Sequence, residues 1–306
     1  MQFTAENAEK NTKKQGAEHL PPWLKIRLTT SRRSAEIRSL VSRNRLHTVC
    51  RSAACPNRTE CWNAGTATFM ILGNVCTRGC RFCNVPKGLP SGLDRDEPDR
   101  VADAVASLHL QYAVITSVTR DDLADGGASL FAETIKAIRA RSPECRVEVL
   151  IPDFQGSETA LRAVLDAKPD VLNHNLETVP SLYPLVRPQA DYRRSLKLIS
   201  RAGSFGFVTK TGLMLGLGEG TDEVLSVMNA LRETGCSLLT LGQYLRPGKS
   251  HLRVEKYYHP DEFSRLREQA LSLGFRHVAA GPLVRSSYHA EQYGPSCVSV
   301  TMNQSS

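Results

Sequence analysis

The sequence predicts a partial (β/α)6 barrel of the TIM type with N- and C-terminal extensions, and two observations predict it. From residue 66 onward, apolar runs rich in β-branched residues alternate with segments whose apolar residues recur at helical spacing. Six strand–helix units follow one another in this way, and such alternation gives a parallel sheet with its helices outside. Because the crossovers are right-handed, the units are expected to curl toward a barrel.

The expected elements follow in order along the chain. Strands are predicted at 66–72, 112–117, 145–151, 170–175, 207–215 and 237–243. Helices are predicted near 97–110 and at 128–141, 157–167, 191–202, 221–234 and 261–273. The helix at 128–141 shows the evidence clearly, because Phe131, Ile135 and Ile138 recur on one helical face. A further helix is expected before the barrel, from Ser34 to about Leu46.

Four segments are expected within the chain. They are a flexible N-terminal arm at 1–19, an N-terminal extension at 20–65, the barrel at 66–275 and a C-terminal segment at 276–306. Residues 1–19 are polar and charged, which predicts an arm without a packed core and no export signal. We therefore expect a cytoplasmic protein. No run of 18 apolar residues exists, so no membrane span is expected.

The chain is basic, with 39 Lys and Arg against 31 Asp and Glu and a formal charge of +8. A basic protein can favour nucleic acid, an anionic membrane or an acidic protein partner. Aromatic residues make up only 6% of the sequence, and no basic run is interleaved with them. We therefore expect no nucleic-acid partner.

Three cysteines, Cys76, Cys80 and Cys83, are spaced CxxxCxxC, and we call them the radical-site cysteines. Complete thiolate ligation of a [4Fe–4S] cluster takes four cysteines, so three leave one iron open for another ligand. A zinc site of three cysteines and one histidine is the alternative. No histidine lies between His47 and His109, so the zinc site lacks a local fourth ligand and the cluster is favoured.

Cys50, Cys55 and Cys61 form a second set just upstream, and we call them the upstream cysteines. In a reducing compartment, clustered cysteines are more often metal ligands than disulfides. Three thiolates again fall one short of four, so a mononuclear zinc site or three unrelated core cysteines stand as alternatives to a second cluster. Cys145 and Cys236 adjoin strand-like runs and are expected to be buried.

The CxxxCxxC loop, with Phe82 directly before its third cysteine, resembles that of radical S-adenosylmethionine (SAM) enzymes. The two cysteine sets in this order resemble the lipoyl synthase family, as do residues 68–73 and the run Arg285-Ser286-Ser287-Tyr288. The resemblance extends from about Pro21 to about Tyr288, with further matches at 121–128, 173–178 and 241–247. Residues 51–54 and 57–59 depart from the usual pattern, although every expected ligand is present.

The resemblance implies two [4Fe–4S] clusters and SAM as cofactors. The radical-site cysteines are implied to hold the cluster that binds SAM and, when reduced, releases a 5′-deoxyadenosyl radical, so the cofactor carries the hard chemistry. The upstream cysteines are implied to hold an auxiliary cluster. Its fourth ligand is assigned to Ser287 in preference to Ser286.

The activity implied is that of a sulfurtransferase that inserts two sulfur atoms at C6 and C8 of a protein-bound octanoyl-lysine to form the lipoyl cofactor. An unactivated C–H bond offers no acidic proton, so a radical is needed to open it. The implied partners are octanoylated lipoyl carrier proteins, namely the acyltransferase of a 2-oxoacid dehydrogenase and the glycine cleavage H protein. An electron donor such as flavodoxin or ferredoxin and a protein that resupplies the auxiliary cluster are also implied.

Polar residues gather where the predicted strands end, which is where parallel barrels place their sites. With Phe82, the candidate SAM contacts are Thr116, Ser117, Asp121, Asp122, Asn173, Asn175 and Glu177. The aspartates suit the SAM amino group, and Glu177 suits a ribose hydroxyl. A turn with a helix cap is the alternative for the aspartates, and a core hydrogen-bond network is the alternative for the asparagines. Arg187 and Arg246 are expected to meet a substrate carbonyl or to form surface ion pairs.

Two rival functions stand beside this one. The first is another radical enzyme with two clusters, such as a tRNA methylthiotransferase, which would typically carry an additional RNA-binding module. The second is an iron–sulfur electron carrier or redox sensor, which would need neither a six-unit barrel nor an open iron.

Overall fold

The computed structural model describes residues 20–25, 31–52, 55–64 and 66–292. The expected arm at 1–19 lies outside these ranges, as do Cys297 and two residues of the upstream loop, Ala53 and Ala54. Across the described ranges, no helix combines the length and the apolar character needed to cross a membrane.

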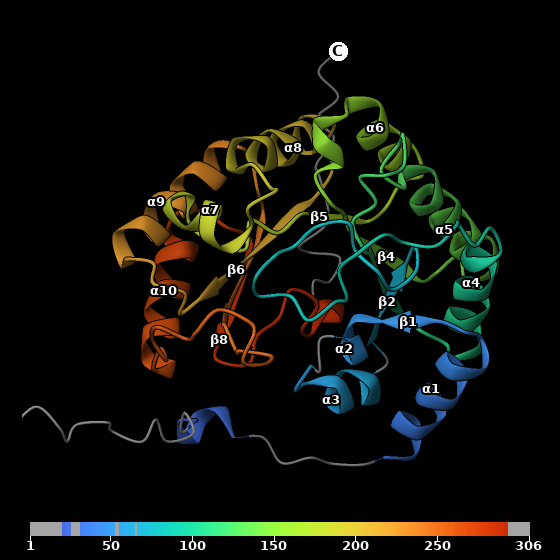
Figure 1. The fold of residues 1–306 in the computed structure, drawn as a ribbon, viewed down its shortest axis with the longest axis horizontal. Helices are drawn as coiled ribbons and strands as arrows, with labels where there is room; N and C mark the ends of the chain where they lie inside the picture. The colour runs from blue at the N-terminus through green and yellow to red at the C-terminus, as the bar shows by residue number, and fades with distance from the viewer. Residues whose placement is uncertain (1–19, 26–30, 53–54, 65, 293–306) are drawn as a thin grey trace, which may run out of the picture.

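A sheet of eight strands, ordered β1 to β8, forms the centre of the molecule (Figure 1). The strands are β1 (His47–Thr48), β2 (Thr66–Ile71), β3 (Tyr112–Ser117), β4 (Arg146–Leu150), β5 (Val171–Asn173), β6 (Thr209–Leu215), β7 (Leu238–Gln243) and β8 (His277–Gly281). β1 pairs with β2 in the antiparallel sense, and all later neighbours pair in parallel. The sheet is an open arc, which confirms the partial barrel.

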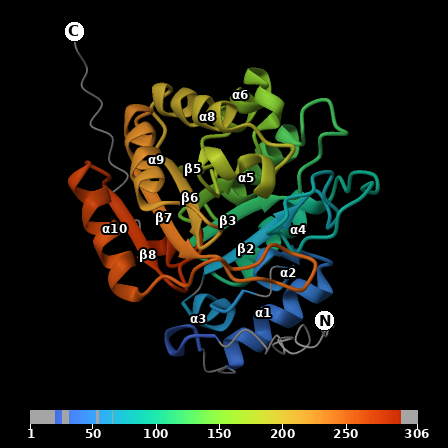
Figure 2. The ribbon, with the colours of Figure 1, turned by 60° about the vertical axis from the view of Figure 1, so that its left-hand side comes forward.

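Helices cover the outer face of the arc, as Figures 1 and 2 show. Those of the barrel are α4 (Glu97–Ser107), α5 (Ala128–Arg141), α6 (Glu158–Asp166), α8 (Tyr192–Ser204), α9 (Thr221–Glu233) and α10 (Pro260–Ser272). The short helix α7 (Tyr183–Val186) lies instead beside the cysteine loop, where the Arg81 N–H donates to the Val186 carbonyl at 2.9 Å. The N-terminal extension contributes α1 (Arg32–Arg43), α2 (Val49–Ser52) and α3 (Arg58–Asn63). Short 3₁₀ turns lie at Pro22–Leu24, Phe154–Gly156, Pro180–Leu182 and Ala290–Gln292.

The six expected strands correspond to β2 through β7, and the structure adds two more. β8 contains Ala279, Ala280 and Gly281, residue types that strands disfavour, so local propensity does not predict a strand there. β8 also carries the parallel sheet past residue 275, into the segment expected to be a C-terminal extension. β1 spans only two residues and is held in place by its pairing with β2.

The strands are buried on both faces, as parallel strands covered by helices must be. Every residue of β2 and of β7 is buried. Cys145 and Cys236 are 2% and 0% exposed, which confirms their expected burial. Packing of these apolar strands holds the barrel rigid and leaves the strand ends free to carry polar side chains.

A polar network crosses this apolar interior. Lys210 Nζ donates to both carboxylate oxygens of Glu148 at 3.0 Å, and both side chains are fully buried. Tyr112 donates its hydroxyl to Glu148 at 2.8 Å, and Asn173 donates its amide at 2.9 Å. The buried carboxylate is thus paired and hydrogen-bonded, which is the condition for keeping a charge inside a core.

Candidate metal and cofactor site

A cavity of about 510 Å³ lies at the carboxyl ends of the strands, where parallel barrels place their sites. All three radical-site cysteines line it. Four of the candidate SAM contacts also line it, namely Thr116, Ser117, Asn175 and Glu177, together with Phe82 of the cysteine loop. The structure therefore brings most of the candidate residues for SAM binding to one place.

The cysteine loop leaves β2 through two residues with positive φ, Leu72 at 69° and Gly73 at 91°. The loop then closes on itself, because the Cys76 N–H donates to the Pro86 carbonyl at 2.8 Å and Gly88 donates back to Cys76 at 3.0 Å. Cys76 Sγ accepts backbone N–H groups from Arg78 at 3.4 Å and from Thr119 at 3.3 Å. Such donors stabilise a thiolate, which is the form that binds metal.

Arg78 anchors this loop to the barrel. It donates twice to Asp121, at 2.6 and 2.8 Å, and once to Asp153 at 2.6 Å. Asp153 has no exposed side-chain surface, so its burial works against ionisation, yet the adjacent guanidinium holds the pKa of this carboxyl below its usual range. Sequence reasoning did not single out Arg78 or Asp153, since nothing local pairs two residues 75 positions apart.

Burial raises the pKa of Cys83 to about 11, and the nearby thiols of Cys80 and Cys76 add to the shift. Burial also raises the pKa of Cys80, partly opposed by Arg187. The thiols of Cys80 and Cys83 thus lie close enough to the neighbouring cysteines for those neighbours to raise their pKa. A cationic iron cluster placed among them reverses that shift, so the donor set fits such a cluster.

Glu177 has the left-handed backbone that side chains rarely adopt, with φ of 70°. Its N–H donates to the Gly212 carbonyl at 2.9 Å, and its carbonyl accepts from Met214 at 2.8 Å, so β6 holds this conformation. Asn175 donates its amide to the Glu177 carboxylate at 3.1 Å. Burial raises the pKa of Glu177, with Arg187 opposing the shift. Strained residues of this kind concentrate at functional sites.

Three buried polar atoms in the cavity wall have no hydrogen-bond partner among the described residues: Ser117 Oγ, Asn175 Oδ1 and Arg187 Nε. Arg187 is otherwise well bonded, because its Nη1 donates to the carbonyls of Asn175 at 2.9 Å and Leu176 at 3.1 Å. Buried polar groups in native proteins are normally paired, so these atoms call for a polar ligand. A ligand with amino, carboxylate and hydroxyl groups, such as SAM, fits them.

The remaining candidates lie elsewhere. Asp121 pairs with Arg78, Asp122 pairs with Arg120 at 2.8 Å, and neither aspartate lines the cavity. Asn173 lies in the core network with Glu148 and does not line the cavity. The structure therefore gives these three side chains protein partners: a core network for Asn173, as its alternative described, and ion pairs with arginines for Asp121 and Asp122, which the alternative of a turn with a helix cap did not include. Arg187 is buried, and within the described ranges it forms no surface ion pair.

The upstream cysteines also lie together. Burial raises the pKa of Cys55, and Cys50 adds to that shift. Burial raises the pKa of Cys61 to about 12, with contributions from both other thiols. Within the part of the chain that the structure describes, no three His, Cys, Asp or Glu side chains surround a position for a single metal ion.

The C-terminal segment folds back onto the upstream cysteines. Thr68 on β2 lies beside Cys50, where it opposes the rise that burial causes in the pKa of that thiol, and the Thr68 hydroxyl donates to Ser287 Oγ at 3.0 Å. The segment is held by further bonds, from Asn57 to the Leu283 carbonyl, from Tyr288 and His289 to Glu60, and from Thr66 to Glu291. Ser287 thus shares a neighbour with Cys50, whereas Ser286 lines the cavity. Arg285 lies near Cys55, and burial lowers the pKa of its guanidinium.

The barrel, the cysteine loop and the cavity together define an enzyme of the radical SAM class, and the Radical SAM superfamily matches residues 70–231. A lipoyl synthase of Rubrobacter xylanophilus is 56% identical over 274 residues, which cover 89% of this chain and 85% of the relative. A lipoyl synthase of Chlorobaculum parvum is 54% identical over 277 residues, covering 90% of this chain and 95% of the relative. The chain belongs to the lipoyl synthase family.

Two solved structures share the fold. Methylornithine synthase superposes with a TM-score of 0.51 at 12% identity, over 80% of this chain and 81% of the other. SuiB of Streptococcus suis bound to S-adenosylmethionine gives a TM-score of 0.54 at 9% identity, over 78% of this chain and 58% of the other. At these identities the likeness shows the fold alone, and that fold is the open barrel.

Family membership makes this chain a radical SAM sulfurtransferase with a [4Fe–4S] cluster and SAM as cofactors, and a second cluster is consistent with the family.

Proposed function

We propose that this chain forms the lipoyl cofactor by inserting two sulfur atoms, at C6 and C8, into an octanoyl chain carried on a protein lysine. One observation carries the proposal: the cavity lies between the two cysteine sets. The radical-site cysteines form one wall, and the other includes Val49, Pro56, Arg285 and Ser286, the neighbours of the upstream set. An acyl chain bound between them faces both sites at once.

Within this proposal, the radical-site cysteines hold one [4Fe–4S] cluster, while Cys50, Cys55, Cys61 and Ser287 hold the auxiliary one. Together with SAM, the first cluster supplies the radical that removes hydrogen. Ser117, Asn175 and Arg187 bind and orient SAM through the polar atoms that lack protein partners among the described residues, and the Glu177 carboxylate beside them contributes further acceptors. The fixed backbone of Glu177 and the buried position of Arg187 mean that little reordering is needed on binding.

The apolar part of the wall suits the acyl chain. Met70, Val118, Leu150, Leu213 and Val284 line the cavity and come from different elements of the barrel. They bury the hydrocarbon and exclude water from the site. The segments have matching roles: the extension at 20–65 carries the auxiliary cluster, the barrel from residue 66 through β8 carries the radical site, and the described residues after β8 include Ser287, which closes the auxiliary cluster.

The proposed partners follow from this activity. They are octanoylated lipoyl carrier proteins, an electron donor such as flavodoxin or ferredoxin, and a protein that rebuilds the auxiliary cluster. The eight cysteines in the described ranges are all free thiols. A reducing compartment keeps them so, and a cytoplasmic location is proposed on that ground.

Anaerobic incubation with SAM, a reductant and an octanoyl-lysine peptide tests the proposal. Mass spectrometry should detect the peptide carrying two sulfur atoms, and the protein should contain about eight irons per chain, four for each cluster. SAM cleavage without any sulfur in the peptide would favour a different radical enzyme. A protein that binds iron but cleaves no SAM would favour an electron carrier.

A further inference from the structure

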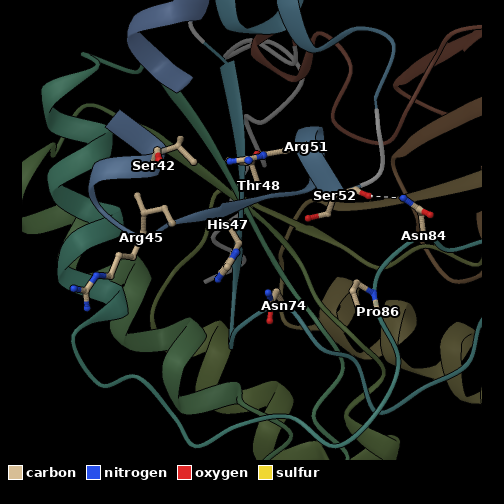
Figure 3. Close-up of a pocket in the computed structure, with 11 residues that line it drawn as sticks. Ser42, Arg45, His47, Thr48, Arg51, Ser52, Asn74, Asn84 and Pro86 are labelled. Carbon is tan, nitrogen blue, oxygen red and sulfur yellow. Dashed lines mark hydrogen bonds between the residues drawn. The ribbon is translucent and has the colours of Figure 1, made fainter. Parts of the chain in front are cut away.

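A second hollow, of about 610 Å³, lies between the N-terminal extension and the cysteine loop (Figure 3). We call it the outer pocket. Its lining comes from the end of α1, from β1 and α2, and from the cysteine loop, and includes Arg45, His47, Arg51, Asn74, Asn84 and Pro86. The outer pocket is separate from the cavity of the candidate site, since Asn84 is the one described residue that lines both.

The outer pocket is lined by cationic and neutral side chains. Arg45 and Arg51 are exposed, and neither forms an ion pair with a residue in the described ranges. The charge of Arg45 makes a minor contribution to lowering the pKa of Asp94, whose main partner is Arg100 at 2.6 Å. Burial lowers the pKa of His47, and the charge of Arg51 lowers it further. Two unpaired guanidinium groups therefore give this pocket a positive potential.

The cysteine loop forms one wall of the outer pocket. The carbonyl of Pro86 accepts the N–H of Cys76 at 2.8 Å. Asn84 directly follows Cys83, and its amide donates to the Ser52 carbonyl at 3.0 Å (Figure 3). The pocket therefore lies one hydrogen bond or one peptide unit away from two radical-site cysteines.

The outer pocket and the cavity lie on different sides of the segment at 47–52. Val49 lines the cavity, whereas Thr48 and Arg51 line the outer pocket. In the proposed function SAM and the acyl chain fill the cavity. An electron that enters from the outer pocket reaches the radical site without displacing either of them.

We propose that the outer pocket is the docking site of an acidic electron-transfer protein that reduces the radical-site cluster, an inference that rests on the proposed function. One electron leaves the reduced cofactor of the donor and enters the cluster held by the radical-site cysteines, and no atom or proton is transferred. Arg45 and Arg51 contact carboxylates of the donor. Complementary charge of this kind steers transient redox encounters, whose interfaces are small.

The test replaces both cations, as Arg45→Glu with Arg51→Glu, and drives SAM cleavage in two ways. Reduced flavodoxin is one reductant, and dithionite, which needs no docking site, is the other. The matched control is Arg193→Glu with Lys197→Glu, two exposed cations on α8, on the opposite side of the barrel in Figure 1. Iron content is measured for every variant. The single variant Arg45→Glu is included because Arg51 is adjacent to Cys50, so a change at Arg51 could disturb the upstream cysteines.

With flavodoxin at low salt, kcat/KM for 5′-deoxyadenosine formation should fall about tenfold in the double variant, and rising salt should shrink the difference. The dithionite-driven rate should stay unchanged, and the control variant should match the wild type with both reductants. Binding of oxidised flavodoxin, measured by calorimetry, should weaken about tenfold in the same variant. Arg45→Glu alone should show part of both losses.

Equal flavodoxin-driven rates in the double variant and the control would overturn the docking site. A higher KM for an octanoylated carrier protein under dithionite, with flavodoxin binding intact, would assign the pocket to the carrier and would also overturn it. If the wild type cleaves no SAM even with dithionite, the proposed function itself fails.

Discussion

The Ser287→Ala variant tests whether the Ser287 hydroxyl is a ligand of the auxiliary cluster or only a hydrogen-bonding group of the fold. In the structure, this hydroxyl accepts one hydrogen bond, from Thr68 at 3.0 Å. A single bond of that kind is worth about 0.5–1.5 kcal/mol. The C-terminal segment keeps its other bonds to the upstream loop and to β2, including those that join Asn57 to Leu283 and Tyr288 to Glu60. We therefore expect the segment to stay docked and the free energy of unfolding to fall by about 1 kcal/mol.

The effect on sulfur insertion should be much larger than that small loss of stability. If Ser287 is the fourth ligand, its loss leaves the auxiliary cluster open, and even the loss of groups that only support metal ligands commonly costs about 10–100-fold in affinity or activity. An alkoxide is also a harder and weaker partner for iron than a thiolate, which suits a cluster that is consumed. We expect thiolated product to fall by that factor and 5′-deoxyadenosine to stay within about twofold of wild type.

The assay is the ratio of thiolated octanoyl-lysine peptide to 5′-deoxyadenosine, measured anaerobically by mass spectrometry, with iron content on the same samples. Ser286→Ala is the matched control, because Ser286 lies in the same motif but lines the cavity. A wild-type ratio for Ser287→Ala would refute the assignment to this serine. A wild-type ratio for the double Ser286→Ala, Ser287→Ala variant would show that the motif supplies no essential ligand.

Three further predictions concern other parts of the molecule. Replacing the radical-site cysteines with alanine should abolish formation of 5′-deoxyadenosine. Replacing the upstream cysteines with alanine should leave 5′-deoxyadenosine formation intact and remove only the thiolated product. Sulfur insertion by the upstream variant would contradict the proposal that the auxiliary cluster donates the sulfur. Lys210→Met should lower the free energy of unfolding by about 3–5 kcal/mol in urea titrations, because it strands the buried Glu148 carboxylate, and Lys210→Met with Glu148→Leu should lose less; equal losses would contradict this reasoning. Burial lowers the pKa of His174 to about 4 in the folded protein, from an ordinary value of 6.5. Between pH 4 and pH 6.5, therefore, the His174 imidazole is protonated in the unfolded chain but not in the folded one, and the free energy of unfolding falls as the pH falls. The loss amounts to about 1.4 kcal/mol of unfolding free energy per pH unit, and above pH 6.5 no such loss occurs. The pH dependence of the free energy of unfolding of His174→Gln should lack this slope.

The barrel was predictable because its signal is local. Strands buried on both faces must be apolar over their whole length, so β2 to β7 stand out as runs of β-branched and aliphatic residues. β8 lacked that signal, because alanine and glycine take part in a sheet only when a neighbouring strand supplies the pairing. β1 is likewise held by β2 and by no propensity of its own.

The polar residues at the strand ends were harder to assign from the sequence. Asn173 and Asn175 are two positions apart, yet the first bonds to Glu148 in the core and the second lies at the cavity wall. Depth along a strand depends on the stagger between strands, which no local pattern encodes. Asp121 and Asp122 are similar, because their arginine partners decide whether either is available to a ligand.

The spacing of each cysteine set is a covalent property of a short loop, so it could be read directly and it pointed to iron–sulfur chemistry. Which side chains surround those loops is decided by contacts between distant positions. Thr68 and Ser287 are 219 residues apart and meet only because β2 lies beneath the returning C-terminal segment. The outer pocket exists for the same reason, since α1 and β1 must pack beside the cysteine loop before Arg45 and Arg51 can border it. Residue types and their spacings can be read from the sequence alone. Fourth ligands, ion-pair partners and pockets depend on how folding brings distant segments together.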